Sequence, residues 1–102
     1  MGTLSRQVEA TIASDNAFTD PIAFYGGPFN FSVSGSFTAT VTIQRRFTNP
    51  ATGLYDGTWL DVSTYTSERE DVGIVPDEEV QYRAGVKTGE YTSGTINLRL
   101  SQ

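Results

Sequence analysis

The chain has 102 residues, a net charge of −5, and neither cysteine nor histidine. This length predicts one domain, and the two missing residue types exclude disulfides, thiolate metal ligands, thiol nucleophiles and imidazole general bases. Because an acidic chain repels phosphate backbones, we expect no nucleic-acid partner; we expect no membrane attachment either, since no apolar run approaches the ~20 residues of a spanning helix.

Residues 1–26 contain one clear strand pattern. Val8, Ala10 and Ile12 alternate with polar residues, as in a half-buried strand, and residues 22–25 give a weaker one. The segment has no basic region followed by an apolar region, so we expect no secretory signal and synthesis in the cytoplasm. We expect residues 1–26 to form an N-terminal arm or an edge segment of the domain.

The next stretch carries the strongest strand pattern. Gly26-Gly27-Pro28 predicts a break before a short strand over 29–33, and Ser34-Gly35-Ser36 predicts a tight connection. From Phe37 to Phe47 apolar residues occupy alternate positions, apart from Arg45, and this pattern predicts one continuous strand.

Two arginines, Arg45 and Arg46, end this pattern on opposite faces. One interpretation places Arg45 at the rim of the core and Arg46 in solvent. The alternative is that both contact an acidic groove on a neighbouring protein, because the planar guanidinium group suits interface ion pairs.

Aromatic residues are concentrated early in the chain. Five of the twelve fall within fourteen positions: Phe18, Phe24, Tyr25, Phe29 and Phe31. Core packing explains such a cluster, but exposed members would anchor an interface or form a platform for carbohydrate. We include Phe18, Phe24, Tyr25 and Phe29 among the candidate interface residues.

The second half carries the whole negative excess. After a loop over 48–58 that ends in an Asp56-Gly57 turn, residues 59–66 predict a strand with Leu60 and Val62 on one face and Trp59 and Tyr65 on the other. Residues 80–86 and 96–100 predict two further strands.

The acidic run between them, residues 68–79 (EREDVGIVPDEE), holds six carboxylates and one arginine. We expect a loop, either solvated, or docking on a basic partner surface, or binding Ca²⁺ through clustered oxygens. Glu78 and Glu79 are the candidate interface residues in this run, together with Arg45 and Arg46 from the strand expected over 37–47.

About seven short strands separated by turn residues predict an all-β, single-domain antiparallel β-sandwich with jelly-roll or immunoglobulin-like topology. No residue pattern points to catalysis, so we expect a non-enzymatic protein without a cofactor.

From Gly27 to the C-terminus the chain resembles small all-β structural proteins of tailed bacteriophages. The matching pieces are Gly35–Phe47, Gly57–Val62, Tyr82-Arg83, Tyr91–Thr95 and Arg99–Gln102. The resemblance implies a virion component, a decoration or cement protein that binds the outside of the capsid and stabilises it. The implied partners are the major capsid protein or another virion protein. Independently of the resemblance, we expect an oligomer or a lattice-bound protein, because a chain this small gains stability from further contacts and the edge strands of an open sandwich need covering. Two alternatives stay open, a tail or head–tail joining protein and a carbohydrate-binding adhesion module.

Overall fold

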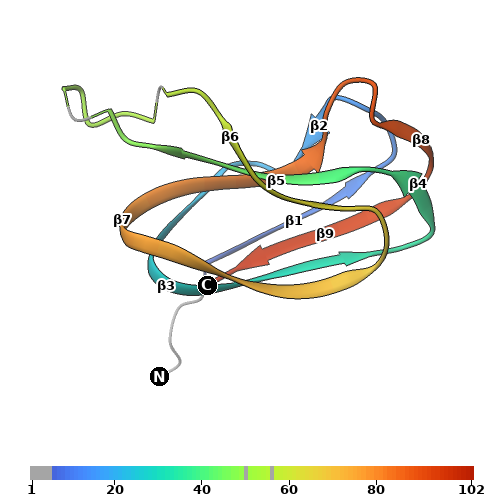
Figure 1. Ribbon diagram of the computed structural model, residues 1–102, viewed down its shortest axis with the longest axis horizontal. Helices are drawn as coiled ribbons and strands as arrows, with labels where there is room; N and C mark the ends of the chain where they lie inside the picture. Colours follow the sequence, from blue (N-terminus) through green and yellow to red (C-terminus); the bar gives the residue numbers. More distant parts are fainter. Residues whose placement is uncertain (1–5, 50, 56) are drawn as a thin grey trace.

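The chain folds into a single all-β domain, an antiparallel β-sandwich (Figure 1). The computed structural model describes residues 6–49, 51–55 and 57–102. Its dimensions are 40 × 36 × 18 Å. The strands are β1 (Gln7–Ile12), β2 (Ala17–Phe18), β3 (Ile22–Ser34), β4 (Phe37–Ala39), β5 (Val41–Phe47), β6 (Leu60–Tyr65), β7 (Arg69–Val86), β8 (Tyr91–Gly94) and β9 (Ile96–Ser101).

Seven strands form one sheet that folds back on itself. Six of them follow the order β1-β9-β3-β7-β5-β6, β2 pairs with β7, and β4 and β8 form a separate two-stranded sheet. The long strands β3 and β7 take part in both layers: β3 pairs with β7 over both of its halves, while only residues 80–85 of β7 pair with β5. Figure 1 shows β7 curving around one end of the molecule and returning.

The fold-over occurs where glycine allows it. The register of β3 against β7 shifts between Tyr25 and Gly27, and Gly26 and Gly27 both have positive φ, 21° and 106°. A bulge of this kind bends a strand without ending it. The predicted break at Gly26-Gly27-Pro28 was therefore wrong: the two expected short strands are one strand, β3.

The core lies between the layers and consists of alternate positions of the long strands. Phe24, Phe29 and Tyr82 form an aromatic cluster with ring centroids 4.8–5.6 Å apart. Burying each such side chain contributes about 1.5–3 kcal/mol. The other buried hydrophobic residues are Ile12, Phe31, Val33, Val41, Ile43, Tyr65, Val75, Val80, Ala84, Val86, Ile96, Leu98 and Leu100.

From Arg69 onward the acidic run over 68–79 is part of strand β7, not the loop that we expected. Residues 69–75 pair with β3 in antiparallel register, so that Val33, Phe31 and Phe29 lie opposite Arg69, Asp71 and Gly73. The buried backbone N–H and C=O groups of β3 need hydrogen-bond partners on both sides of the strand. This requirement outweighs the low strand propensity of the acidic residues. Within the described residues no group of three or more carboxylates is placed to hold a metal ion.

Two further strands differ from their predictions. The strand expected over Phe37–Phe47 is divided into β4 and β5, because the Thr40 amide turns to donate to the Glu90 carbonyl at 3.0 Å. In β6 the register against β5 shifts between Ile43 and Gln44. Tyr65 then lies opposite buried Val41 while Leu60 lies opposite Arg45, so the bulge removes the simple alternation expected across this strand.

Part of the N-terminal segment belongs to the sheet. Gln7–Ile12 forms β1 at one edge, paired along its length with β9, and residues 22–26 begin β3. Residues 1–5 lie outside the described chain, as does Asp56 of the expected Asp56-Gly57 turn. Over the part of the chain that is described, no helix is long and apolar enough to cross a membrane.

Candidate interaction surface

Two of the candidate interface residues are core residues. Phe24 is fully buried and Phe29 is 3 % exposed, and both pack against Tyr82. A side chain enclosed by its own core cannot contact a partner, so their assignment to an interface was wrong and the core-packing alternative holds. Phe18 is half-buried on β2, whereas Tyr25 is 60 % exposed.

The two arginines of β5 lie on opposite faces, and neither is fully exposed. Arg45 is half-buried with its guanidinium 5.3 Å from the Phe47 ring centre. Arg46 does not extend into solvent as one interpretation expected: its Nε donates to Gln81 Oε1 at 2.7 Å, and its guanidinium lies 4.4 Å from the Trp59 ring centre.

Arg46 is the end of a four-residue stack, Phe18, Arg83, Trp59 and Arg46, which we call the arginine–aromatic stack. The guanidinium carbon of Arg83 lies 4.0 Å from the Phe18 ring centre and 4.4 Å from that of Trp59. Arginine and aromatic groups therefore alternate. Each contact is a cation–π interaction, which is strongest where water is excluded.

Side-chain hydrogen bonds hold this stack in place. Arg83 Nε donates to Gln44 Oε1 at 2.9 Å, and Gln44 Nε2 donates to Asp61 Oδ1 at 2.9 Å. Lys87 Nζ completes the chain of contacts 2.7 Å from Asp61 Oδ2. The bonds from Gln44 and Lys87 lower the pKa of the Asp61 carboxyl.

A glycine brings Phe18 into the stack. A Cβ added to Gly85 would overlap the carbonyl oxygen of Ala17 and the backbone of Phe18. The absence of a side chain lets the two-residue strand β2 lie directly against β7, where Thr19 N donates to the Ala84 carbonyl at 2.8 Å.

Each arginine of the stack donates its Nε hydrogen to a glutamine rather than to a carboxylate. Among the described residues, no ion pair joins Arg46 or Arg83 to a carboxylate. Burial, and next the charge of Arg46, lower the pKa of the Arg83 guanidinium. In a chain of net charge −5 the stack is thus a local concentration of uncompensated positive charge.

Four candidate residues share one face of the sheet. Directly opposite residues point to the same side, and the pairs Tyr25 with Glu79, Arg46 with Gln81 and Phe18 with Gly85 all lie along alternate positions of β7. We call this surface the outer face; its residues are Phe18, Tyr25, Gln44, Arg46, Trp59, Glu79, Gln81 and Arg83.

Glu78 and Glu79 lie in β7 after the bend and are exposed. Glu79 Oε1 is 3.9 Å from Arg6 Nη1. Burial raises the pKa of Tyr55 to about 12, and the neighbouring Glu79 carboxylate adds to this effect. Glu79 therefore lies beside both Arg6 and Tyr55 on the outer face.

Sequence reasoning missed Trp59, Arg83 and Gln44 as members of this surface. They come from three separate strand regions, and only the pairing of β5, β6 and β7 brings them together. The available signal was the presence of the single tryptophan and three arginines in neighbouring predicted strands.

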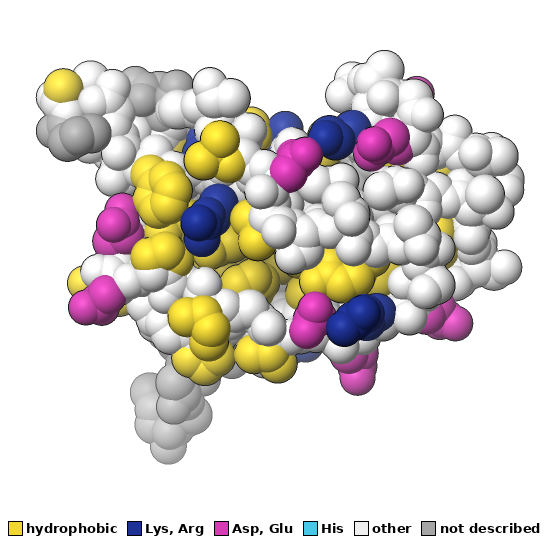
Figure 2. All heavy atoms as spheres, viewed as in Figure 1, with side chains coloured by type: hydrophobic (Ala, Val, Ile, Leu, Met, Phe, Trp, Pro, Cys, Tyr) yellow, Lys and Arg dark blue, Asp and Glu magenta, His cyan; other side chains and the backbone are white. Residues whose placement is uncertain are grey.

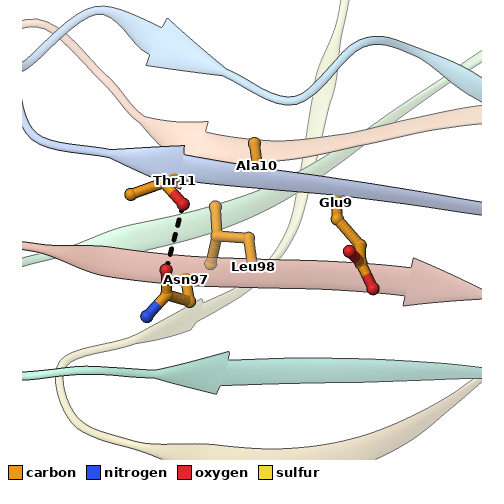
Figure 3. Close-up of a pocket in the computed structure, with 5 residues that line it drawn as sticks. All are labelled: Glu9, Ala10, Thr11, Asn97 and Leu98. Atoms are coloured by element: carbon orange, nitrogen blue, oxygen red, sulfur yellow. Dashed lines mark hydrogen bonds between the residues drawn. The ribbon is translucent and has the colours of Figure 1, made fainter.

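A shallow hollow between β1 and β9 has fewer side chains that could bind a partner. Figure 3 shows its lining of Glu9, Ala10, Thr11, Asn97 and Leu98, with a 3.0 Å hydrogen bond from Thr11 Oγ1 to Asn97 Oδ1. Its carboxylate, that of Glu9, already lies 3.4 Å from Arg99. The hollow therefore offers a weaker binding surface than the outer face.

No family model, curated protein or solved structure matches this chain. The outer face is accordingly interpreted from its own chemistry.

Proposed function

We propose that this chain is a non-enzymatic structural protein of a phage virion, which attaches to the outside of the capsid and stabilises it. Its partner is the major capsid protein or another virion protein, and it works as part of a multimeric assembly. The resemblance to tailed-phage proteins in Gly35–Phe47, Gly57–Val62, Tyr91–Thr95 and Arg99–Gln102 supports the virion assignment.

The observation that carries the binding role is the arginine–aromatic stack. Tryptophan and arginine are the residue types that most often dominate protein–protein binding energy. Here they are already ordered by stacking and by the hydrogen bonds that Arg46 and Arg83 donate to Gln81 and Gln44, so less side-chain entropy is lost on binding. Repetition over a capsid lattice would multiply a modest contact by avidity.

The test is attachment to purified shells that lack the protein. We expect Trp59→Ala and, separately, Arg46→Glu to weaken attachment by about 30-fold, the effect of removing a contact of about 2 kcal/mol. Arg99→Glu is the matched control, because Arg99 is an exposed arginine on β9, away from the outer face. Thermal unfolding of each variant separates lost binding from lost folding.

The same experiment distinguishes the alternatives. A decoration protein should reach a copy number close to that of the capsid protein, whereas a tail or joining protein should be scarce on particles. An adhesion module should bind glycans in isolation. A folded wild-type protein that leaves shells undecorated would exclude the proposal.

A further inference from the structure

The sandwich is open along one side, between β6 and the first half of β7. Within the described chain β6 pairs only with β5, and residues 69–75 of β7 pair only with β3. Each strand therefore has one edge without a hydrogen-bonded neighbour. Figure 2 looks onto this side and shows hydrophobic side chains gathered between the two strands, whose course Figure 1 gives. We call the opening the seam.

The seam leads to a small cavity that reaches the core. The cavity has a volume of about 70 Å³, and the rings of Phe29 and Phe31 and the side chain of Ile43 line it. Gly73 on the β7 edge leaves room for the Phe29 ring, which a Cβ would overlap. The β6 side of the seam exposes apolar residues, Leu60 at 50 % and Val62 at 41 %.

The two edges differ in how they are protected. On β7, Asp71 Oδ1 accepts the amide of Val72 at 2.9 Å, and Asp71 Oδ2 accepts the Tyr65 hydroxyl at 2.9 Å. The Asp71 carboxylate thus occupies a backbone amide on the β7 edge, and its bond to Tyr65 joins β7 to β6 at one end of the seam. The β6 edge has no proline or lysine, and Asp61, its one charged residue, is held by Gln44 and Lys87. Edges without such protection accept a further strand.

An unpaired charge marks the side of β5 that faces the seam. Arg45 lies opposite Leu60 and on the same side of β5 as Ile43, which lines the cavity. It forms no ion pair with any described carboxylate. A half-buried arginine beside an apolar cavity favours an occupant that combines apolar groups with a carboxylate.

We propose that the seam binds an extended segment of a partner protein, which adds to β6 as an extra strand. Its backbone satisfies the free edge, an apolar side chain enters the cavity over Phe29, Phe31 and Ile43, and a carboxylate on the same face of the segment pairs with Arg45. This mode of recognition takes affinity from main-chain hydrogen bonds and specificity from alternate side chains. The site is separate from the outer face and does not depend on the virion assignment.

The test uses a short synthetic peptide in which valine, valine and aspartate occupy alternate positions and threonine occupies the others. Added to the intact protein, it should slow hydrogen exchange of the β6 amides. Replacing its aspartate with lysine should weaken binding by about tenfold, as the loss of one interfacial charge pair would. Arg45→Glu should reverse this preference.

Val62→Lys supplies the edge variant, and Leu54→Lys is its control, because Leu54 is also an exposed apolar residue, at 62 %, but lies outside the seam. We expect Val62→Lys to abolish the exchange protection and Leu54→Lys to leave it unchanged. Protection that is absent in the wild type, or that survives Val62→Lys, would overturn the proposal. Dimerisation of the wild type that Val62→Lys removes would also overturn it, since the edge would then serve a second copy.

Discussion

The hydroxyl of Tyr82 is a polar group buried in an apolar part of the core. Its side chain is fully buried between Phe24 and Phe29, yet its hydroxyl has no hydrogen-bond partner among the described residues. Burying a hydroxyl without a partner costs free energy, because the bond to water is lost and not replaced.

We therefore expect Tyr82→Phe to stabilise the protein. The ring contacts are kept and the unpaired oxygen is removed, so the free energy of unfolding should rise by about 1 kcal/mol and the melting temperature by about 4–8 °C. Urea unfolding and calorimetry measure both. Tyr65→Phe is the opposite case, since Tyr65 donates to Asp71, and it should destabilise. A fall in stability for Tyr82→Phe would mean that the hydroxyl has a partner in solution.

The carboxyl of Asp61, which accepts a hydrogen bond from Gln44 beside the arginine–aromatic stack, makes the stability of the fold depend on pH. Its pKa lies below the ordinary value of 3.8, because Gln44 and then Lys87 bond to the charged carboxylate. A group whose pKa is lower in the folded state stabilises the fold above its unfolded pKa, and this contribution is lost as the pH falls through the folded pKa. Stability should therefore decline below about pH 4.

We expect Asp61→Asn to reduce this decline. The variant should be less stable than the wild type at neutral pH, and the difference should shrink as the pH falls through the lowered pKa of the Asp61 carboxyl in the folded state. Urea unfolding across this range provides the measurement. Asp20→Asn, at an exposed position between β2 and β3, is the control. Parallel curves for Asp61→Asn and the wild type would contradict the assignment.

At the scale of elements, β9 supports both of its neighbours. It pairs with β1 on one side and with β3 on the other, and Ile96, Leu98 and Leu100 are each at most 1 % exposed. Deleting residues 95–102 would leave β1 without a partner and would remove three core side chains at about 2–5 kcal/mol each. The summed loss is as large as the whole free energy of unfolding of a typical domain, which is about 5–15 kcal/mol.

We expect the truncated chain to lose its cooperative thermal transition. Circular dichroism and calorimetry test this, and Leu98→Ala in the full chain gives a graded version with an expected cost of about 2–5 kcal/mol. Leu54→Ala, at an exposed position, should be close to neutral. A truncated protein that stays soluble and melts cooperatively would disprove the role assigned to β9.

Strands with regular alternation could be predicted from the sequence, and strands formed through long-range pairing could not. The alternation in 96–100 and 80–86 follows directly from burial of one face, and the structure confirms both. Residues 69–79 show charge and a proline, which locally indicate a loop. They belong to a strand because β3 pairs with residues 69–75 and again from Glu79 onward. The bend at Gly26 and Gly27 was misread as a break, because a bulge and a turn use the same residues.

The outer face was only partly predictable for the same reason. Arg46 and Phe18 were selected as unusual residues within their own segments. Their stacking partners Arg83 and Trp59 come from β7 and from the residue preceding β6, and no local pattern relates them. Phe24 and Phe29 show the reverse error, since composition alone cannot tell a core aromatic residue from an exposed one.

On the scale of the whole molecule, positive and negative charge occupy different places. The arginine–aromatic stack lies on β5 and β7, whereas Glu78 and Glu79 follow the β7 bend with Asp77 beside them. A partner that contacts both must present acidic and basic groups in the matching order. Such complementarity acts chiefly on the rate of association and on orientation.

The last prediction concerns this acidic end of the molecule. We expect Glu78→Lys combined with Glu79→Lys to slow attachment to purified shells by about tenfold at low salt, with a smaller effect at high salt, because exposed charges are screened by ions. Glu79 also pairs with Arg6, so Glu78→Lys alone separates the long-range effect from loss of that contact. Glu9→Lys, on the edge strand β1, is the charge-matched control for the single variant Glu78→Lys. Attachment rates that stay equal to those of the wild type across the salt series would show that Glu78 and Glu79 face solvent in the assembly, and would leave the arginine–aromatic stack as the part of the outer face that docks.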